Sequence, residues 1–142
     1  GTWDVEENKF NVIFVEGNLI IDSPIIVREA AFLAFIVKGN ITINGTIGHS
    51  SGSYLTTATA NRVTQTDLAG LFITDGAFIT MPSDRQLVAA GTFVADTFNL
   101  QRNLGASNST NPGELFMYRP DLWRYAPEEL KEIKIDWSEV AP

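Results

Sequence analysis

The chain has 142 residues, enough for one domain with a hydrophobic core, and its 44% of hydrophobic residues argues against extended disorder. Its net charge of −7 and its scattered basic residues argue against partners bound through a nucleic-acid backbone or an anionic membrane surface. Because there is no cysteine, disulfides, thiolate metal sites and cysteine nucleophiles are excluded.

No segment of this sequence is expected to span a membrane. The longest apolar stretch, from Ala30 to Val37, is far too short to cross a bilayer. The chain begins with Gly1 and not with methionine, so a signal or anchoring segment would lie upstream of it.

The first half of the chain has the composition of strands and turns. Residues 1–10 are mostly polar and are expected to form an entry strand or a cap. Residues 11–46 are rich in Ile, Val, Phe and Thr and are interrupted by Gly, Asn and Pro, which predicts short strands. Ile41 and Ile43 alternate with polar residues, so that strand should have one buried face.

A short apolar run, a glycine and a second β-rich run recur four times. The repeated units cover residues 13–21, 35–43, 71–80 and 87–95. A unit that recurs within one chain predicts stacked, nearly equivalent layers. Each repeat glycine is expected at a corner that needs a positive φ or room for a close neighbour. These glycines are Gly17, Gly39, Gly76 and Gly91.

Two segments depart from this rhythm. Residues 45–67 are polar, contain His49, the only histidine, and are expected to form a long excursion. Loops of this length without structure of their own are often functional. Residues 103–113 are rich in Gly, Asn, Ser and Pro and are expected to form a linker.

The last segment, residues 114–142, differs in being rich in aromatic residues and proline. One short helix is predicted to begin at Pro127, because proline suits the first helical position and acidic residues follow it. The aromatic residues either cover the β body or contact a neighbouring subunit. Together with Trp3 at the other terminus, the candidate capping or assembly contacts are Phe116, Tyr118, Trp123, Tyr125 and Trp137.

The predicted fold is therefore all-β: a short parallel β-solenoid over residues 1–113 with an aromatic C-terminal extension over residues 114–142. The alternative is a β-sandwich built from antiparallel hairpins. In that case Glu16-Gly17, Lys38-Gly39 and Asp75-Gly76 would each form a two-residue turn.

The units FVEGNLIID, FIVKGNITING and GLFITDGAFIT resemble the β-solenoid rungs of bactofilin-like polymer-forming proteins. They also resemble the soluble part of bacterial cell-surface or pilus-associated proteins with a β-helical body. The closing stretch from Asn111 is similar to the aromatic C-terminal ends of such proteins, so the likeness covers residues 11–46 and 68–142. It implies a structural or assembly role at the cell envelope, and it carries over no catalytic residue.

No catalytic, cofactor or metal site is predicted. His49 lies near Ser50, Ser51 and Ser53, but no Gly-x-Ser-x-Gly elbow presents a serine nucleophile. One histidine cannot supply the ligands of a zinc site, and the aspartates are too isolated for a calcium loop. The glycines are too widely spaced for a phosphate-binding loop.

The functional hypothesis is a structural or assembly module of a bacterial surface appendage, without enzyme activity. Its expected partners are copies of itself or other envelope proteins, with no nucleic acid, and its expected location is extracellular or in the envelope. The alternative is a carbohydrate-binding or carbohydrate-cleaving β-helix, since glycoside hydrolysis needs two carboxylates, usually with aromatic platforms.

Overall fold

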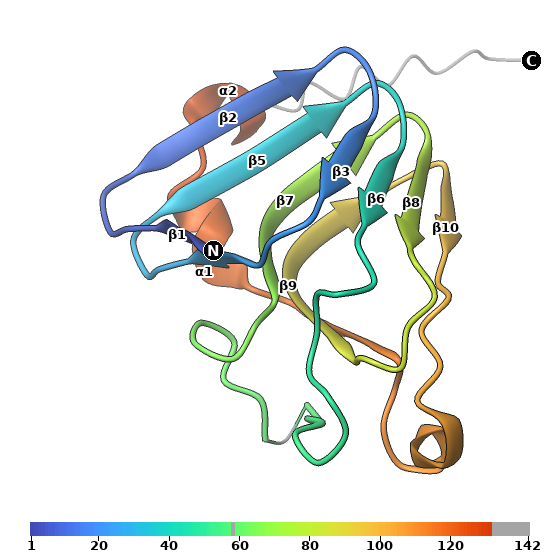
Figure 1. Ribbon diagram of the computed structural model, residues 1–142. Coiled ribbons are helices and arrows are strands. Elements are labelled where there is room, and N and C mark those ends of the chain that lie inside the picture. Colours follow the sequence, from blue (N-terminus) through green and yellow to red (C-terminus); the bar gives the residue numbers. More distant parts are fainter. Residues whose placement is uncertain (58, 132–142) are drawn as a thin grey trace, which may run out of the picture.

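The computed structural model describes residues 1–57 and 59–131 (Figure 1). These residues form eleven strands, a 3₁₀ helix and two short α-helices, which confirms the predicted, mainly β class. The strands are β1 (Trp3–Val5), β2 (Phe10–Val15), β3 (Leu19–Ile21), β4 (Ile25–Val27), β5 (Phe32–Val37), β6 (Ile41–Ile43), β7 (Leu68–Thr74), β8 (Ala77–Thr80), β9 (Leu87–Val94), β10 (Thr97–Asn99) and β11 (Glu114–Met117). The helices are η1 (Gly105–Ser109), α1 (Pro120–Arg124) and α2 (Glu128–Lys131).

The strands form two open parallel sheets, and the chain passes from one to the other repeatedly. The larger sheet contains β1, β4, β7, β5 and β2, and continues from β7 through β9 to β11. The smaller sheet has the order β10-β8-β6-β3. The strands on the two sides of Gly17, Gly39 and Gly76 therefore belong to different sheets. Every pairing between these named strands is parallel, so the two-residue turns do not close antiparallel hairpins.

Strands of successive repeats pair in register, and we refer to each repeat as a layer. Layer 1 contains β1 to β3, layer 2 contains β4 to β6, layer 3 contains β7 and β8, and layer 4 contains β9 and β10. In the larger sheet Ile13 lies opposite Phe35, Phe35 opposite Phe72, and Phe72 opposite Phe93. In the smaller sheet Ile41 lies opposite Phe78. Matching positions of the sequence repeats thus lie opposite one another in neighbouring strands.

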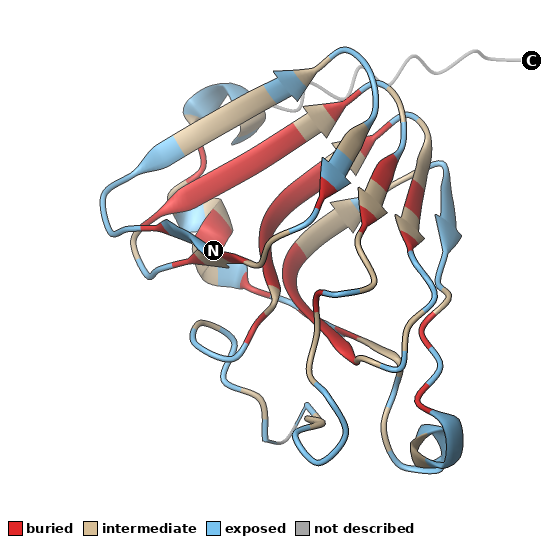
Figure 2. Cartoon of the chain, in the orientation of Figure 1, coloured by how far each residue is buried: buried red, intermediate tan, exposed pale blue. Residues whose placement is uncertain are grey.

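The core lies between the two sheets and is organised around an aromatic stack. The rings of Phe35 and Phe72 have centroids 5.5 Å apart, and those of Phe72 and Phe93 are 5.3 Å apart and nearly parallel. Phe78, from the smaller sheet, meets Phe93 edge-on at 5.6 Å. Figure 2 shows that β5 and β7, in the middle of the larger sheet, are the most buried strands, whereas β2 is mainly intermediate and β10 is exposed.

Three of the four predicted corner glycines lie in turns between the sheets. Gly17, Gly39 and Gly76 link β2 to β3, β5 to β6 and β7 to β8, and none of them has a positive φ. At Gly39 and Gly76 the reason for glycine is close approach instead, whereas a Cβ on Gly17 would meet no atom within 4 Å. A Cβ on Gly39 would lie 2.7 Å from the carbonyl oxygen of Gly17, and one on Gly76 would lie 2.9 Å from that of Gly39.

Gly91 has the positive φ and the close neighbour predicted for a corner, but it is not in the equivalent turn between the sheets. It lies inside β9, opposite Gly70 of β7, and both have a positive φ, of +141° and +138°. A Cβ on Gly91 would collide with the carbonyl oxygen of Gly70. The corner position of layer 4 is occupied by Asp96, whose amide donates a hydrogen bond to the carbonyl of Gly76. In the fourth repeat, Asp96 and not Gly91 is therefore the structural equivalent of Gly76.

The C-terminal region begins differently from the prediction. Residues 114–117 form β11, which pairs with β9 in the larger sheet because its apolar residues continue the stack. The helix expected at Pro127 is present as α2, but α1 was not predicted. Pro120 at the first position and Asp121 in the first turn favour this earlier helix.

Candidate functional site

Both ends of the stack leave a strand edge without a partner among the described residues. At one end, β2 pairs only with β5 and β3 only with β6. At the other, β10 pairs only with β8 and β11 only with β9. Such edges expose unpaired amide and carbonyl groups, which another strand can join.

The first end carries an apolar hollow, which we call the N-end groove. It has a volume of about 270 Å³, and its apolar lining is formed by Trp3, Leu19, Ile20, Ile21, Ile25 and Phe35. The indole of Trp3 meets the ring of Phe35 edge-on at 6.0 Å, so this predicted contact residue extends the internal aromatic stack outward. The side chain of Ile20 is 68% exposed.

The second end carries a matching hollow, the C-end groove. It has a volume of about 330 Å³ and is lined by Phe93, Phe98, Leu100 and Phe116. The rings of Phe93 and Phe116 pack edge-on at 5.1 Å, so the aromatic stack reaches this surface as well. Phe98 and Leu100 are each nearly half exposed. Both ends of the molecule thus combine a strand edge with apolar side chains.

The other predicted aromatic contacts divide into two groups. The indole of Trp123 donates to the hydroxyl of Thr92 at 3.2 Å, and Tyr125 packs against Phe10, so both cover the chain itself. Tyr118 is exposed. Trp137, the last predicted contact, lies outside the described residues.

The two departures from the repeat lie at one edge of the molecule, where their loops gather (Figure 1). The buried guanidinium of Arg102 joins them. It donates to the carbonyls of Asn44 and Ile47 at 2.9 Å and to that of Gly45 at 3.2 Å. Burial lowers the pKa of Arg102 from its ordinary value, because the carbonyls replace only part of the lost hydration. Sequence reasoning missed this residue, since nothing in the polar sequence around Arg102 marks this arginine as buried.

A second cluster anchors the excursion at residues 45–67. His49 and Gln86 exchange backbone hydrogen bonds, and the side-chain amide of Gln86 bonds both backbone groups of Leu55. The carboxylate of Asp67 accepts from the amide of Val88 at 2.9 Å and lies 3.5 Å from the imidazole of His49. Burial raises the pKa of Asp67, an effect that these neighbours oppose. The only histidine therefore fastens the excursion to the body.

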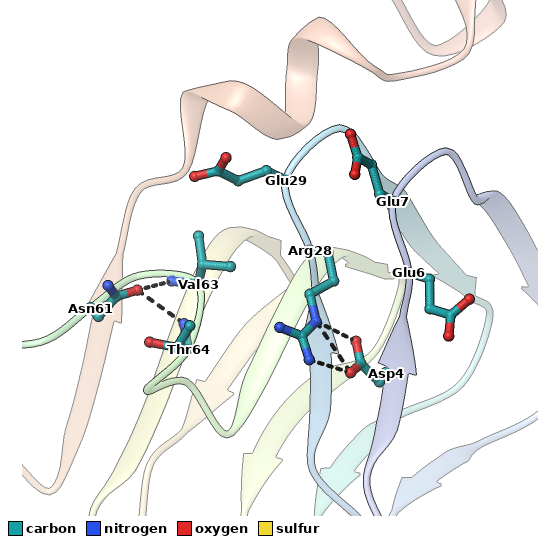
Figure 3. Close-up of a pocket in the computed structure, with 8 residues that line it drawn as sticks. All are labelled: Asp4, Glu6, Glu7, Arg28, Glu29, Asn61, Val63 and Thr64. Carbon is teal, nitrogen blue, oxygen red and sulfur yellow. Dashed lines mark hydrogen bonds and ion pairs between the residues drawn. The ribbon is translucent and has the colours of Figure 1, made fainter.

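A cleft of about 610 Å³ lies beside the turns that follow β1 and β4 (Figure 3). Arg28 bonds Asp4 through two nitrogens at 2.9 and 2.6 Å, and Asn61 caps the opposite wall by accepting from the amides of Val63 and Thr64. The remaining charges on its lining are carboxylates, from Glu6, Glu7 and Glu29. This cleft is polar and acidic, in contrast to the apolar end grooves.

In the described part of the chain, no group of three or more His, Asp or Glu side chains is placed to hold a metal ion. None of the described helices is long and apolar enough to cross a membrane. Comparison with protein-family models, with curated proteins and with solved structures gives no match to this chain. The functional argument therefore rests on the geometry of the chain itself.

Proposed function

We propose that this protein is a structural assembly module whose layers are the turns of a short β-solenoid. The observation that supports the proposal is the in-register parallel pairing from layer to layer, which stops at each end at an apolar edge that no other described strand joins. The proposed partner at either edge is a second copy of the chain.

Edge pairing would extend the contacts that already join the layers. The last strands of one copy would receive the first layer of the next. In the smaller sheet the backbone hydrogen bonds would join β10 to β3, and in the larger sheet they would join β11 to β1 and the second half of β9 to β2, as the register of the strands requires. Strand addition at a sheet edge takes its affinity from main-chain hydrogen bonds and its specificity from side-chain pockets. A contact between unlike ends is heterologous, and it generates a linear assembly where successive copies continue along the direction in which the layers stack.

The placement at a bacterial surface rests on the likeness of the repeated units to β-solenoid rungs of envelope proteins. In this role the protein would act without catalysis.

Light scattering coupled to size-exclusion chromatography over a range of concentrations tests the assembly. The wild-type mass should rise with concentration. Ile20→Lys should block the N-end groove and Phe98→Lys the C-end groove, and both residues are exposed enough to be replaced without disturbing the core. Each single variant should stay monomeric, because one of the two ends is blocked in every copy, and an equimolar mixture of the two should stop at a dimer.

Ser53→Lys, in the exposed excursion, is the matched control and should assemble like the wild type. A wild-type protein that stays monomeric at every concentration contradicts the proposal, as does a mass distribution unchanged by both end variants.

The acidic cleft supports the second candidate, a carbohydrate-binding or carbohydrate-cleaving β-helix. Its carboxylates could accept hydrogen bonds from sugar hydroxyls, and hydrolysis would require two of them at a defined separation. A glycan array and a reducing-sugar assay on the same sample separate the candidates. A monomer that cleaves a glycan, and loses that activity in Glu29→Gln, would favour this alternative.

A further inference from the structure

The outer face of the larger sheet carries a column of apolar side chains that crosses all four layers. Phe14 lies opposite Ile36, Ile36 opposite Ile73, and Ile73 opposite Val94. Side chains alternate along a strand, so these four residues point away from the core occupied by Phe35 and its stacked neighbours. We call them the outer apolar column.

This column is open to solvent at its ends and hollow at its centre. The side chain of Phe14 is 72% exposed and that of Val94 is 50% exposed, while Ile36 and Ile73 are half-buried. A hollow of about 200 Å³ lies over Phe14, Ile36 and Ile73. Its rim is charged and includes Glu16, Lys38 and Asp75. Single exposed apolar residues are ordinary on a surface, but an aligned row of four marks a contact site.

The adjacent column on the same face is already covered by the C-terminal region. Two residues earlier along each strand, Ala34 and Leu71 are buried, and Thr92 accepts the hydrogen bond from Trp123. At the β2 end of this face, Phe10 packs against Tyr125. The helices that follow β11 therefore lie over this face, and α2 is behind β2 in Figure 1.

We propose that the outer apolar column is the docking groove for residues 132–142 of the same chain. These residues follow α2 directly, and their sequence places Ile133, Ile135 and Trp137 at alternate positions with Lys134 and Asp136 between them. In an extended segment this alternation forms one apolar face. Four neighbouring strands span about 15 Å at their usual spacing, and an extended chain gains about 3.3 Å per residue, so the segment is long enough to cross the column.

Cross-linking in the full chain tests the docking, since a protein without native cysteine allows two introduced thiols to be the only ones. The test pair is Asp75→Cys, at the rim of the hollow, with Asp136→Cys. The control pair is Asp22→Cys with Asp136→Cys, because Asp22 is equally exposed but follows β3 of the other sheet. A short bismaleimide should link the test pair within one chain about tenfold more efficiently, since a docked segment is held at high effective concentration beside its groove.

Adding Phe14→Glu to the test pair should reduce the yield to that of the control, and the exposure of Phe14 makes this change compatible with folding. Equal yields for the two pairs would overturn the proposal, and so would a yield that Phe14→Glu leaves unchanged. A cross-link formed only between two chains would show that the column receives a second copy, which also overturns it.

Discussion

Layers 1 and 2 and layers 3 and 4 bend the larger sheet at the same place by different means. In the first two, separate strands are joined by turns over residues 6–9 and 28–31. In the last two, β7 and β9 run through the bend without interruption, with Gly70 and Gly91 at its centre. Leu68 of β7 lies opposite Ile25 of β4, and Leu71 lies opposite Ala34 of β5, so one strand replaces two.

The comparison shows two ways of bending the larger sheet, by a turn between two strands or by a glycine within one strand. The turns place Asn8 and Ala30 at φ values of +64° and +53°, a region that L-residues avoid. They also leave backbone carbonyl groups at the strand ends that need a hydrogen-bond donor. Arg119 donates to the carbonyl of Val27, the last residue of β4, at 2.6 Å. The glycine bends need no such partner, but they bring two backbones too close for any side chain.

The largest effect is expected at a glycine bend. Gly91→Ala should reduce the free energy of unfolding by about 3 kcal/mol or more, because it combines an unfavourable φ with a clash against the backbone of Gly70. Urea denaturation measures the loss. Gly52→Ala is the control, since its φ is +89° but no atom lies near the new methyl group, and it should cost only about 1 kcal/mol. Equal losses in the two variants would mean that the close approach contributes nothing.

The next effect is expected where the turn of layer 2 depends on the C-terminal region. Arg119→Met should cost about 2–3 kcal/mol, because it leaves the carbonyl of Val27 unpaired and removes both bonds to Asp121. Arg124→Met, on an exposed side chain of the same helix, should change the stability by less than about 0.5 kcal/mol. The comparison is made by urea denaturation, and similar losses would contradict a specific role for Arg119.

A smaller effect should appear as a pH dependence. The hydrogen bonds from Arg119 hold the pKa of Asp121 below its ordinary value of 3.8. This interaction therefore contributes stability above the unfolded-state pKa, and the contribution is lost as the pH falls through the lowered pKa. Wild type should exceed Asp121→Asn in stability at neutral pH by a margin that shrinks below pH 3.8. A margin that is constant through acid pH would exclude the ionised pair as its source.

The smallest expected effect has the opposite sign. Ala30→Gly should stabilise the protein by about 0.5 kcal/mol, because glycine relieves the left-handed conformation at a modest entropic cost. Glu29→Gly, one residue earlier and without a positive φ, should instead destabilise it by a similar amount. Thermal denaturation of the two variants side by side is the measurement, and a shift of the same sign in both would refute the explanation.

The sequence was informative where the structure repeats. Apolar runs around Gly17, Gly39 and Gly76 correctly located strands and the turns between the sheets, because side-chain period and turn chemistry are local properties. The misplacement of Gly91 has a physical cause: a glycine within a strand and a glycine at a corner look alike in sequence, and only their neighbours in the adjacent layer distinguish them.

The candidate site could be predicted from the sequence only in part. Trp3 and Phe116, predicted as capping or assembly contacts, line the N-end and C-end grooves, and their role as contacts stays a prediction. Phe98 and Ile20 were missed because their exposure depends on which strand ends the stack. Arg102 bonds groups more than fifty residues away, and no spacing rule connects such positions.

The number of residues between paired positions in successive layers varies along the chain, while the strands stay in register. Phe10 faces Phe32, 22 positions later, whereas Phe35 faces Phe72, 37 positions later, and the extra length lies in the excursion before β7. The fold has thus already absorbed an insertion at this edge. The exposed part of the excursion near Ser51 is consequently a natural graft point, where a foreign peptide could be displayed while the strands on either side keep their partners.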